Sequence, residues 1–136
     1  MAYLNTTDYL LHIQDVNIQQ IINSNEAIRD QANLLAIAEV RSYLIQKYDI
    51  DLELTKTLAS RDQQILSTTI DIALYHLHSR IAPRNIPELR TQRYENAILW
   101  LRMCANGEVT PALEKIIPLS GTRIRSGGNV KNINQY

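Results

Sequence analysis

Two histidines and one cysteine carry the most versatile side-chain chemistry of this chain. His76 and His78 are two positions apart in a segment whose apolar residues recur with helical spacing. On a helix, residues two apart point about 200° away from each other, so these two imidazoles cannot share a metal ion. We expect one of them to be packed and the other exposed. Cys104 lies on an apolar helical stripe, where a packed thiol is more common than a nucleophile.

The carboxylates closest together in sequence alternate with apolar residues, in the order Asp49, Ile50, Asp51, Leu52, Glu53 and Leu54. A period of two predicts an extended segment over residues 49–59, with the acidic side chains on a solvated face. Acid–base catalysis would need one of these carboxylates to be buried and perturbed. The glycines fit no phosphate-binding loop. The sequence therefore predicts no catalytic, cofactor-binding or metal-binding residue, and we expect no enzyme.

Four arginines, Arg80, Arg84, Arg90 and Arg93, surround a proline-containing turn. They could belong to a helix-turn-helix that contacts DNA. Glu88 and Glu95 interleave with them, which favours a solvated face of mixed charge. Over the whole chain, 14 basic and 14 acidic residues cancel, so the charge favours neither nucleic acid nor a membrane surface as a partner.

The composition indicates one helical domain. The chain has 136 residues, enough for a hydrophobic core, and 45% of them are apolar. Phenylalanine is absent and glycine is scarce, which disfavours a β-sandwich or barrel. The N-terminal stretch lacks the basic start of a signal peptide, and no apolar run is long enough to span a membrane. A single cysteine favours a reducing compartment.

Three long helices are predicted, over residues 26–48, 60–82 and 87–106, packed as an antiparallel bundle. One or two short helices, starting near Asp8 and Asp15, should precede them. The first long helix has an apolar stripe made of Leu34, Ile37, Val40, Leu44 and Tyr48. The second is apolar on more than one side. The third should begin near Pro87 and end at Gly107, because proline suits the first helical turn and glycine the left-handed cap.

The last segment, residues 114–136, differs from the helical domain over residues 1–113. It has basic residues but no acidic residue after Glu114, and too few apolar residues to form its own core. Disorder, contact with DNA and docking onto a partner protein are the three alternatives for this extended tail. We expect disorder in the isolated chain and docking in an assembly. Its proposed docking residues are Arg123, Ile124, Arg125, Val130, Lys131 and Ile133.

Several motifs taken together resemble a known family. They are "AEVRSYLIQKYDIDLEL" (38–54), "DIALYHLHSR" (71–80) and "IPELRTQRYENAILWLRMCANGEV" (86–109). Their order and spacing resemble the small helical head–tail adaptor, or connector, proteins of tailed bacteriophages, especially the Mu-like branch. The matching positions are Tyr48, Leu52, Leu54, Asp71, Ile72, Ala73, Tyr75, Leu77, Arg93, Tyr94, Ala97, Trp100, Leu101, Ala105, Gly107 and Val109.

The resemblance implies a virion protein that forms a ring, typically of twelve copies, beneath the portal protein and continues the DNA channel toward the tail. The implied partners are the portal, other neck or tail proteins, and double-stranded DNA that passes without sequence-specific binding. Asp49, Asp51 and Glu53 would face the channel or the next ring. The expected subunit-packing residues are Asp71, Tyr75, Arg93, Tyr94 and Trp100, with Asp71 pairing with Arg93.

Two other hypotheses remain open at this stage. One is a small helical nucleic-acid-binding or regulatory protein that uses the arginine turn or the tail. The other is a small enzyme that uses Cys104 or His76. The mass of the protein in solution, alone and with a portal, separates the ring from both alternatives. DNA binding that weakens with salt would favour the second hypothesis.

Overall fold

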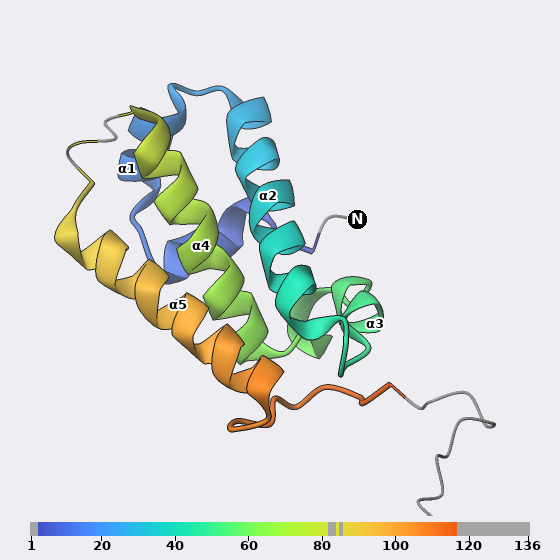
Figure 1. Cartoon of the computed structure of the whole chain (residues 1–136). Coiled ribbons are helices and arrows are strands. Elements are labelled where there is room, and N and C mark those ends of the chain that lie inside the picture. The colour runs from blue at the N-terminus through green and yellow to red at the C-terminus, as the bar shows by residue number, and fades with distance from the viewer. Residues whose placement is uncertain (1–2, 82–83, 85, 117–136) are drawn as a thin grey trace, which may run out of the picture.

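Three long amphipathic segments fold into three helices that pack on one another (Figure 1). The computed structural model describes residues 3–81, 84 and 86–116. Its elements are η1 (Thr6–Leu11), α1 (Asp15–Ile22), α2 (Glu26–Leu44), α3 (Ile50–Leu54), η2 (Leu58–Ser60), α4 (Gln63–Ile81) and α5 (Glu88–Asn106), where η marks a 3₁₀ helix. The described residues contain no β-strand. The predicted all-α fold, with three long helices after two short ones, is confirmed.

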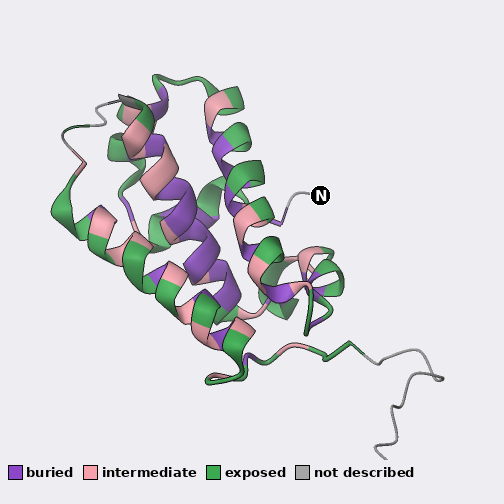
Figure 2. Ribbon diagram, viewed as in Figure 1, coloured by how far each residue is buried: buried purple, intermediate pink, exposed green. Residues whose placement is uncertain are grey.

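Helix α4 is the centre of the core. It contacts α2, α5 and α1, so it buries more than one side. Its buried apolar residues are Ile65, Leu66, Ile70, Ile72, Ala73, Leu74 and Leu77. Figure 2 shows the buried colour running along α4, while α2 and α5 carry it only on their inner sides. The prediction of a second long helix that is apolar on more than one side is confirmed.

Helix α2 packs through a narrower stripe than predicted. Val40 and Leu44 are buried, but Leu34 is 68% exposed. Small residues take inward positions around the middle of the helix, where Ala32 and Ala36 lie against the core. The helix also ends at Leu44 and not at residue 48. Tyr48 instead pairs with Lys115 in an isolated antiparallel bridge.

Polar side chains and one glycine set the helix ends. The Asn25 side chain accepts a hydrogen bond from the Ala27 N–H at the start of α2, and Asp62 accepts one from Ile65 N–H at the start of α4. Gly107 ends α5 with φ +82°, a conformation in which other residues are strained. Pro87 lies one position before α5 begins. The predicted end of the third helix at Gly107 is confirmed.

The predicted extended segment over residues 49–59 is wrong. Residues Ile50–Leu54 form the short helix α3, and a 3₁₀ turn follows. Asp49 caps α3, because its side chain accepts a hydrogen bond from the Leu52 N–H at 3.1 Å. Ile50 and Glu53, three apart, are both buried, whereas Leu52 is exposed. The spacing that decides burial here is therefore the helical one.

The two ends of the described chain are held against the bundle. Tyr3, Leu4 and Tyr9 are buried in the core, and α1 lies against α2 and α4. After α5 the chain returns alongside residues 47–49, where Asp49 N–H donates to Glu114 O at 2.7 Å. The predicted domain boundary at residue 113 therefore falls just before residues that still bond to the helical domain.

Candidate functional site

The N-terminal segment is tied to the start of α4 by a buried ion pair. Arg61 binds both oxygens of the Asp8 carboxylate, at 2.7 and 2.9 Å. The same guanidinium donates to the carbonyl oxygens of Tyr3, at 2.6 Å, and Leu58, at 2.9 Å. Arg61 is only 7% exposed. Because each of its nitrogens has an acceptor, this site is closed and suits a structural role.

Glu53 belongs to the same closed region. Its Oε1 accepts hydrogen bonds from the Tyr3 hydroxyl at 3.1 Å and from the Asp62 N–H at 2.6 Å. The Lys56 ammonium lies 2.8 Å from Oε2. Burial, and next the neighbouring Glu53 charge, raise the pKa of Tyr3, so its phenol stays protonated and donates. At 1% exposure, Glu53 cannot present its charge to a channel, so that part of the channel prediction is wrong.

The other two carboxylates predicted to face a channel lie on the surface. Asp51 is exposed and forms a two-bond pair with Arg41, at 2.7 and 3.2 Å. Asp49 is the cap of α3. Only Asp49 and Asp51 are therefore placed where a ring could expose them, and Arg41 already balances one of them.

A second polar network joins His12 to α4 and α5. His12 Nδ1 lies 2.6 Å from an Asp71 carboxylate oxygen, and Nε2 lies 3.1 Å from the Ser67 hydroxyl. Arg93 approaches both partners, with Nη1 2.8 Å from His12 Nδ1 and 3.5 Å from Asp71. The predicted pairing of Asp71 with Arg93 is confirmed, and His12 is part of it.

Ser67, His12 and Asp71 share the order of contacts found in a Ser-His-Asp triad. Acyl transfer also needs donors placed where the oxyanion forms. Ser67 lies inside α4, where the backbone N–H groups bond to the preceding turn and do not face a substrate. Together with the Arg90 bond to His12 O, at 2.8 Å, this geometry fixes the N-terminal segment onto the bundle.

The predicted packing residues lie between the helices of one subunit. Tyr75 of α4 and Tyr94 of α5 stack, with ring centroids 4.0 Å apart and planes 13° apart. Trp100 is half-buried and lines a hollow beside His12 and Asp71. Trp100 therefore lies near the N-terminal segment of its own chain.

Of the expectations about the reactive side chains, that for Cys104 is confirmed and that for the histidines changes. Cys104 is buried and burial raises the pKa of its thiol, so the thiolate is disfavoured and its packing role is confirmed. His76 and His78 are both half-buried, which corrects the prediction that one is exposed. His76 lies 3.5 Å from a Glu39 oxygen and meets the Tyr75 and Tyr94 rings edge-on. Among the described residues, no three metal-ligating side chains gather.

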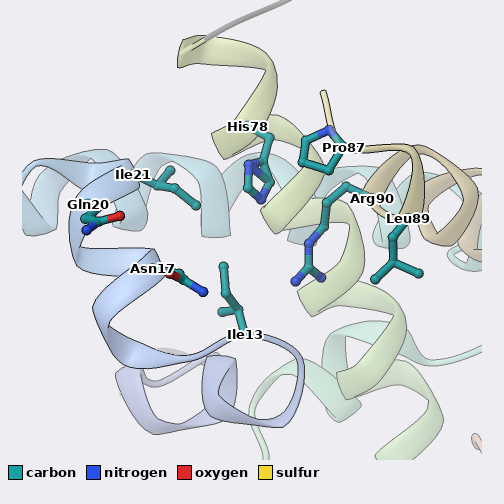
Figure 3. A pocket seen from close by; sticks show the side chains of 8 residues that line it. All are labelled: Ile13, Asn17, Gln20, Ile21, His78, Pro87, Leu89 and Arg90. Carbon is teal, nitrogen blue, oxygen red and sulfur yellow. The ribbon is translucent and has the colours of Figure 1, made fainter. Parts of the chain in front are cut away.

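An open groove lies between α1, α4 and the start of α5 (Figure 3). Its volume is about 500 Å³, and it is lined by Ile13, Asn17, Gln20, Ile21, His78, Pro87, Leu89 and Arg90. Arg90 is 9% exposed, which corrects its predicted place on a solvated face. Burial, and next the charge of Arg93, lower the pKa of Arg90. Burial, and next the charge of Arg90, lower the pKa of His78.

The residues predicted to dock onto a portal or a neighbouring subunit lie outside the described residues; they are Arg123, Ile124, Arg125, Val130, Lys131 and Ile133. Sequence reasoning missed the contacts that Asp8, His12, Arg61 and Arg90 make in the two polar networks. The signal that marks two of these residues is their position: Asp8 and His12 interrupt an apolar stretch. Their partners are too distant in sequence for any local pattern to show.

Comparison with known proteins adds the family. Residues 3–118 match the family described as Bacteriophage Mu, Gp36. No curated protein matches the chain. In the described part of the chain, no helix combines the length and the hydropathy needed to cross a bilayer. The match includes every described helix, from η1 to α5, so the resemblance to Mu-like phage proteins is confirmed at the level of the family. The chain belongs to the bacteriophage Mu Gp36 family.

Proposed function

We propose that this protein is a structural component of the virion neck, where copies form a ring beneath the portal and join the head to the tail. The family match over residues 3–118 is the observation that carries the proposal. The expected location is the host cytoplasm during assembly and the virion afterwards. The expected ring has twelve copies, as the family resemblance implies, and surrounds the passing DNA.

The surface of the bundle supports a role in assembly. Helix α4 lies between α2 and α5 (Figure 1), and both outer helices expose large apolar residues. These include Leu34 and Leu35 on α2, and Leu99 on α5. A head-to-tail ring needs two different contact surfaces on each copy. Exposed leucines on the two outer helices suit such contacts.

The nucleic-acid alternative has less support from the arginine turn. Arg90 is buried and binds the His12 carbonyl, and Arg93 lies against Asp71. Two of the four arginines therefore serve contacts within the subunit. Arg80 and Arg84 are exposed, but two side chains make a small electrostatic footprint for DNA.

The test is removal of the gene from a phage that encodes this chain. We expect filled heads and complete tails that do not join, seen by electron microscopy of the lysate, and recovery of whole particles when the gene is supplied in trans. Whole, infectious particles without the protein would contradict the proposed role.

The C-terminal segment has a separate test. A chain lacking residues 119–136 should keep its helical circular dichroism and lose attachment to the portal, because the basic and apolar residues of this segment are proposed to dock there. The full-length chain is the control in a pull-down on purified portal. Equal binding by both chains would remove the docking role from this segment.

A further inference from the structure

Arg90 is a buried charge with incomplete bonding. Its Nη2 donates to the His12 carbonyl at 2.8 Å, while Nη1 is shielded from solvent and has no hydrogen-bond partner among the described residues. Nε2 of His78, which lines the same groove, is also shielded from solvent and has no hydrogen-bond partner among the described residues. A buried donor without an acceptor is destabilising. A partner that supplies an acceptor to this donor therefore gains binding free energy.

No acidic side chain of the chain completes this site. All 14 acidic side chains lie in the described residues, and none lines the groove. The charge of Asp71 acts on Arg90, but this carboxylate already contacts His12 and Arg93. The positive charge of Arg90 is therefore left for an acceptor from outside the chain.

The other residues that line the groove indicate which side chains a bound partner would place beside its carboxylate. Ile13, Ile21, Pro87 and Leu89 supply apolar surface, and Leu89 is exposed. A second hollow shares Ile13, Asn17 and Arg90, so the surface continues past the N-terminal segment. Figure 3 shows Arg90 and His78 extending from α5 and α4 toward the side of Ile13 and Asn17. A short extended segment with aliphatic side chains fits such a groove.

We propose that this groove binds an acidic, aliphatic segment of a partner protein, with its carboxylate at Arg90 and His78 and its aliphatic side chains on Ile13, Ile21 and Leu89. A side-chain rotation that exposes Nη1 is sufficient for contact, and such rotations are common at interfaces. The chain's own last segment is a poor fit by charge, because its side chains after Glu114 are basic or neutral and a basic segment is repelled by Arg90. The inference goes beyond the ring and does not depend on it.

The experiment uses the full-length chain, labelled with ¹⁵N. An acetylated and amidated peptide, Leu-Asp-Leu-Glu-Leu, is titrated into the millimolar range, with Leu-Asn-Leu-Gln-Leu as its neutral match. We expect amide shifts at Ile13, Asn17 and Leu89, and binding of the acidic peptide about tenfold tighter than that of the neutral one, a difference that corresponds to one charge-assisted contact. Equal binding of the two peptides, shifts elsewhere, or no binding would overturn the proposal.

Variants distinguish binding in the groove from a general attraction between the acidic peptide and basic side chains. Arg90→Gln should remove the preference for the acidic peptide, while Arg102→Gln, at an exposed position of α5, should leave it intact. If Arg90→Gln does not fold, Leu89→Ser decides, because Leu89 is exposed and its replacement should weaken peptide binding about tenfold without unfolding. If the chain alone self-associates and Leu89→Ser separates the copies, a second copy occupies the groove and the proposal falls.

Discussion

Arg61 and Arg90 are two buried arginines in similar positions with different surroundings. Both hold the N-terminal segment through a backbone carbonyl, Tyr3 O for Arg61 and His12 O for Arg90. Only Arg61 also meets a carboxylate, that of Asp8. Arg90 instead keeps an unpartnered nitrogen beside an open groove. Burial of a charge is therefore not enough to assign its role: the closed site suits a structural role, and the open one suits a partner.

The largest expected effect comes from breaking the closed site. Asp8→Ala leaves Arg61 buried without its counter-ion, so we expect a loss of about 3–5 kcal/mol in the free energy of unfolding. Urea denaturation followed by circular dichroism measures it. The matched control is Asp51→Ala, which removes an exposed two-bond pair with Arg41 and should have a much smaller effect. Equal losses of unfolding free energy in the two variants would contradict the structural role of the buried pair of Asp8 and Arg61.

Acid should weaken the same site in a defined direction. Burial by itself raises the pKa of Asp8, but the bonds from Arg61 and the Asn5 N–H, with the Arg61 charge, hold the pKa below its ordinary value of 3.8. A lowered folded-state pKa gives stability that is complete above 3.8 and is lost as pH falls below it, toward the folded-state pKa.

The stability difference between the wild type and Asp8→Asn should therefore be constant above pH 3.8 and shrink below it. Denaturation curves at a series of pH values measure this difference. A difference that is unchanged at the lowest pH at which the protein folds would contradict the ion pair.

The smallest expected effect comes from the open site. Arg90→Gln removes one bond to the His12 carbonyl but also removes a buried charge that has no carboxylate, so we expect a loss of about 1 kcal/mol or less. The same denaturation assay measures it. A loss as large as that of Asp8→Ala would mean that Arg90 is structural, and the contrast between the two sites would disappear.

The long helices can be predicted from the sequence because their signals are local. Apolar residues recur at helical spacing in α4 and α5, and Gly107 marks where α5 ends. The α3 segment is ambiguous, since Ile50 and Leu54 are four apart, a spacing that fits both a strand and one helical turn. The cap at Asp49 decides between them.

The candidate site depends on contacts that no local pattern contains. Arg61 and Asp8 are 53 positions apart, and Arg90 and His12 are 78 apart. The pairing of Asp71 with Arg93 could be predicted only because both residues belong to the motifs by which the sequence resembles the phage adaptor family. For Leu34 the local pattern gave a wrong prediction. Its spacing fits the apolar stripe of α2, but the side chain is exposed, because the helices approach on the neighbouring face that carries Ala32 and Ala36.

The most direct test of the ring proposal is the mass of the purified chain mixed with the portal protein of the same phage, measured by native mass spectrometry. We expect a complex in which one portal ring carries many copies of this chain, and twelve copies from the family resemblance. The absence of any complex, with the chain staying a monomer of 15.6 kDa beside an intact portal, would contradict it.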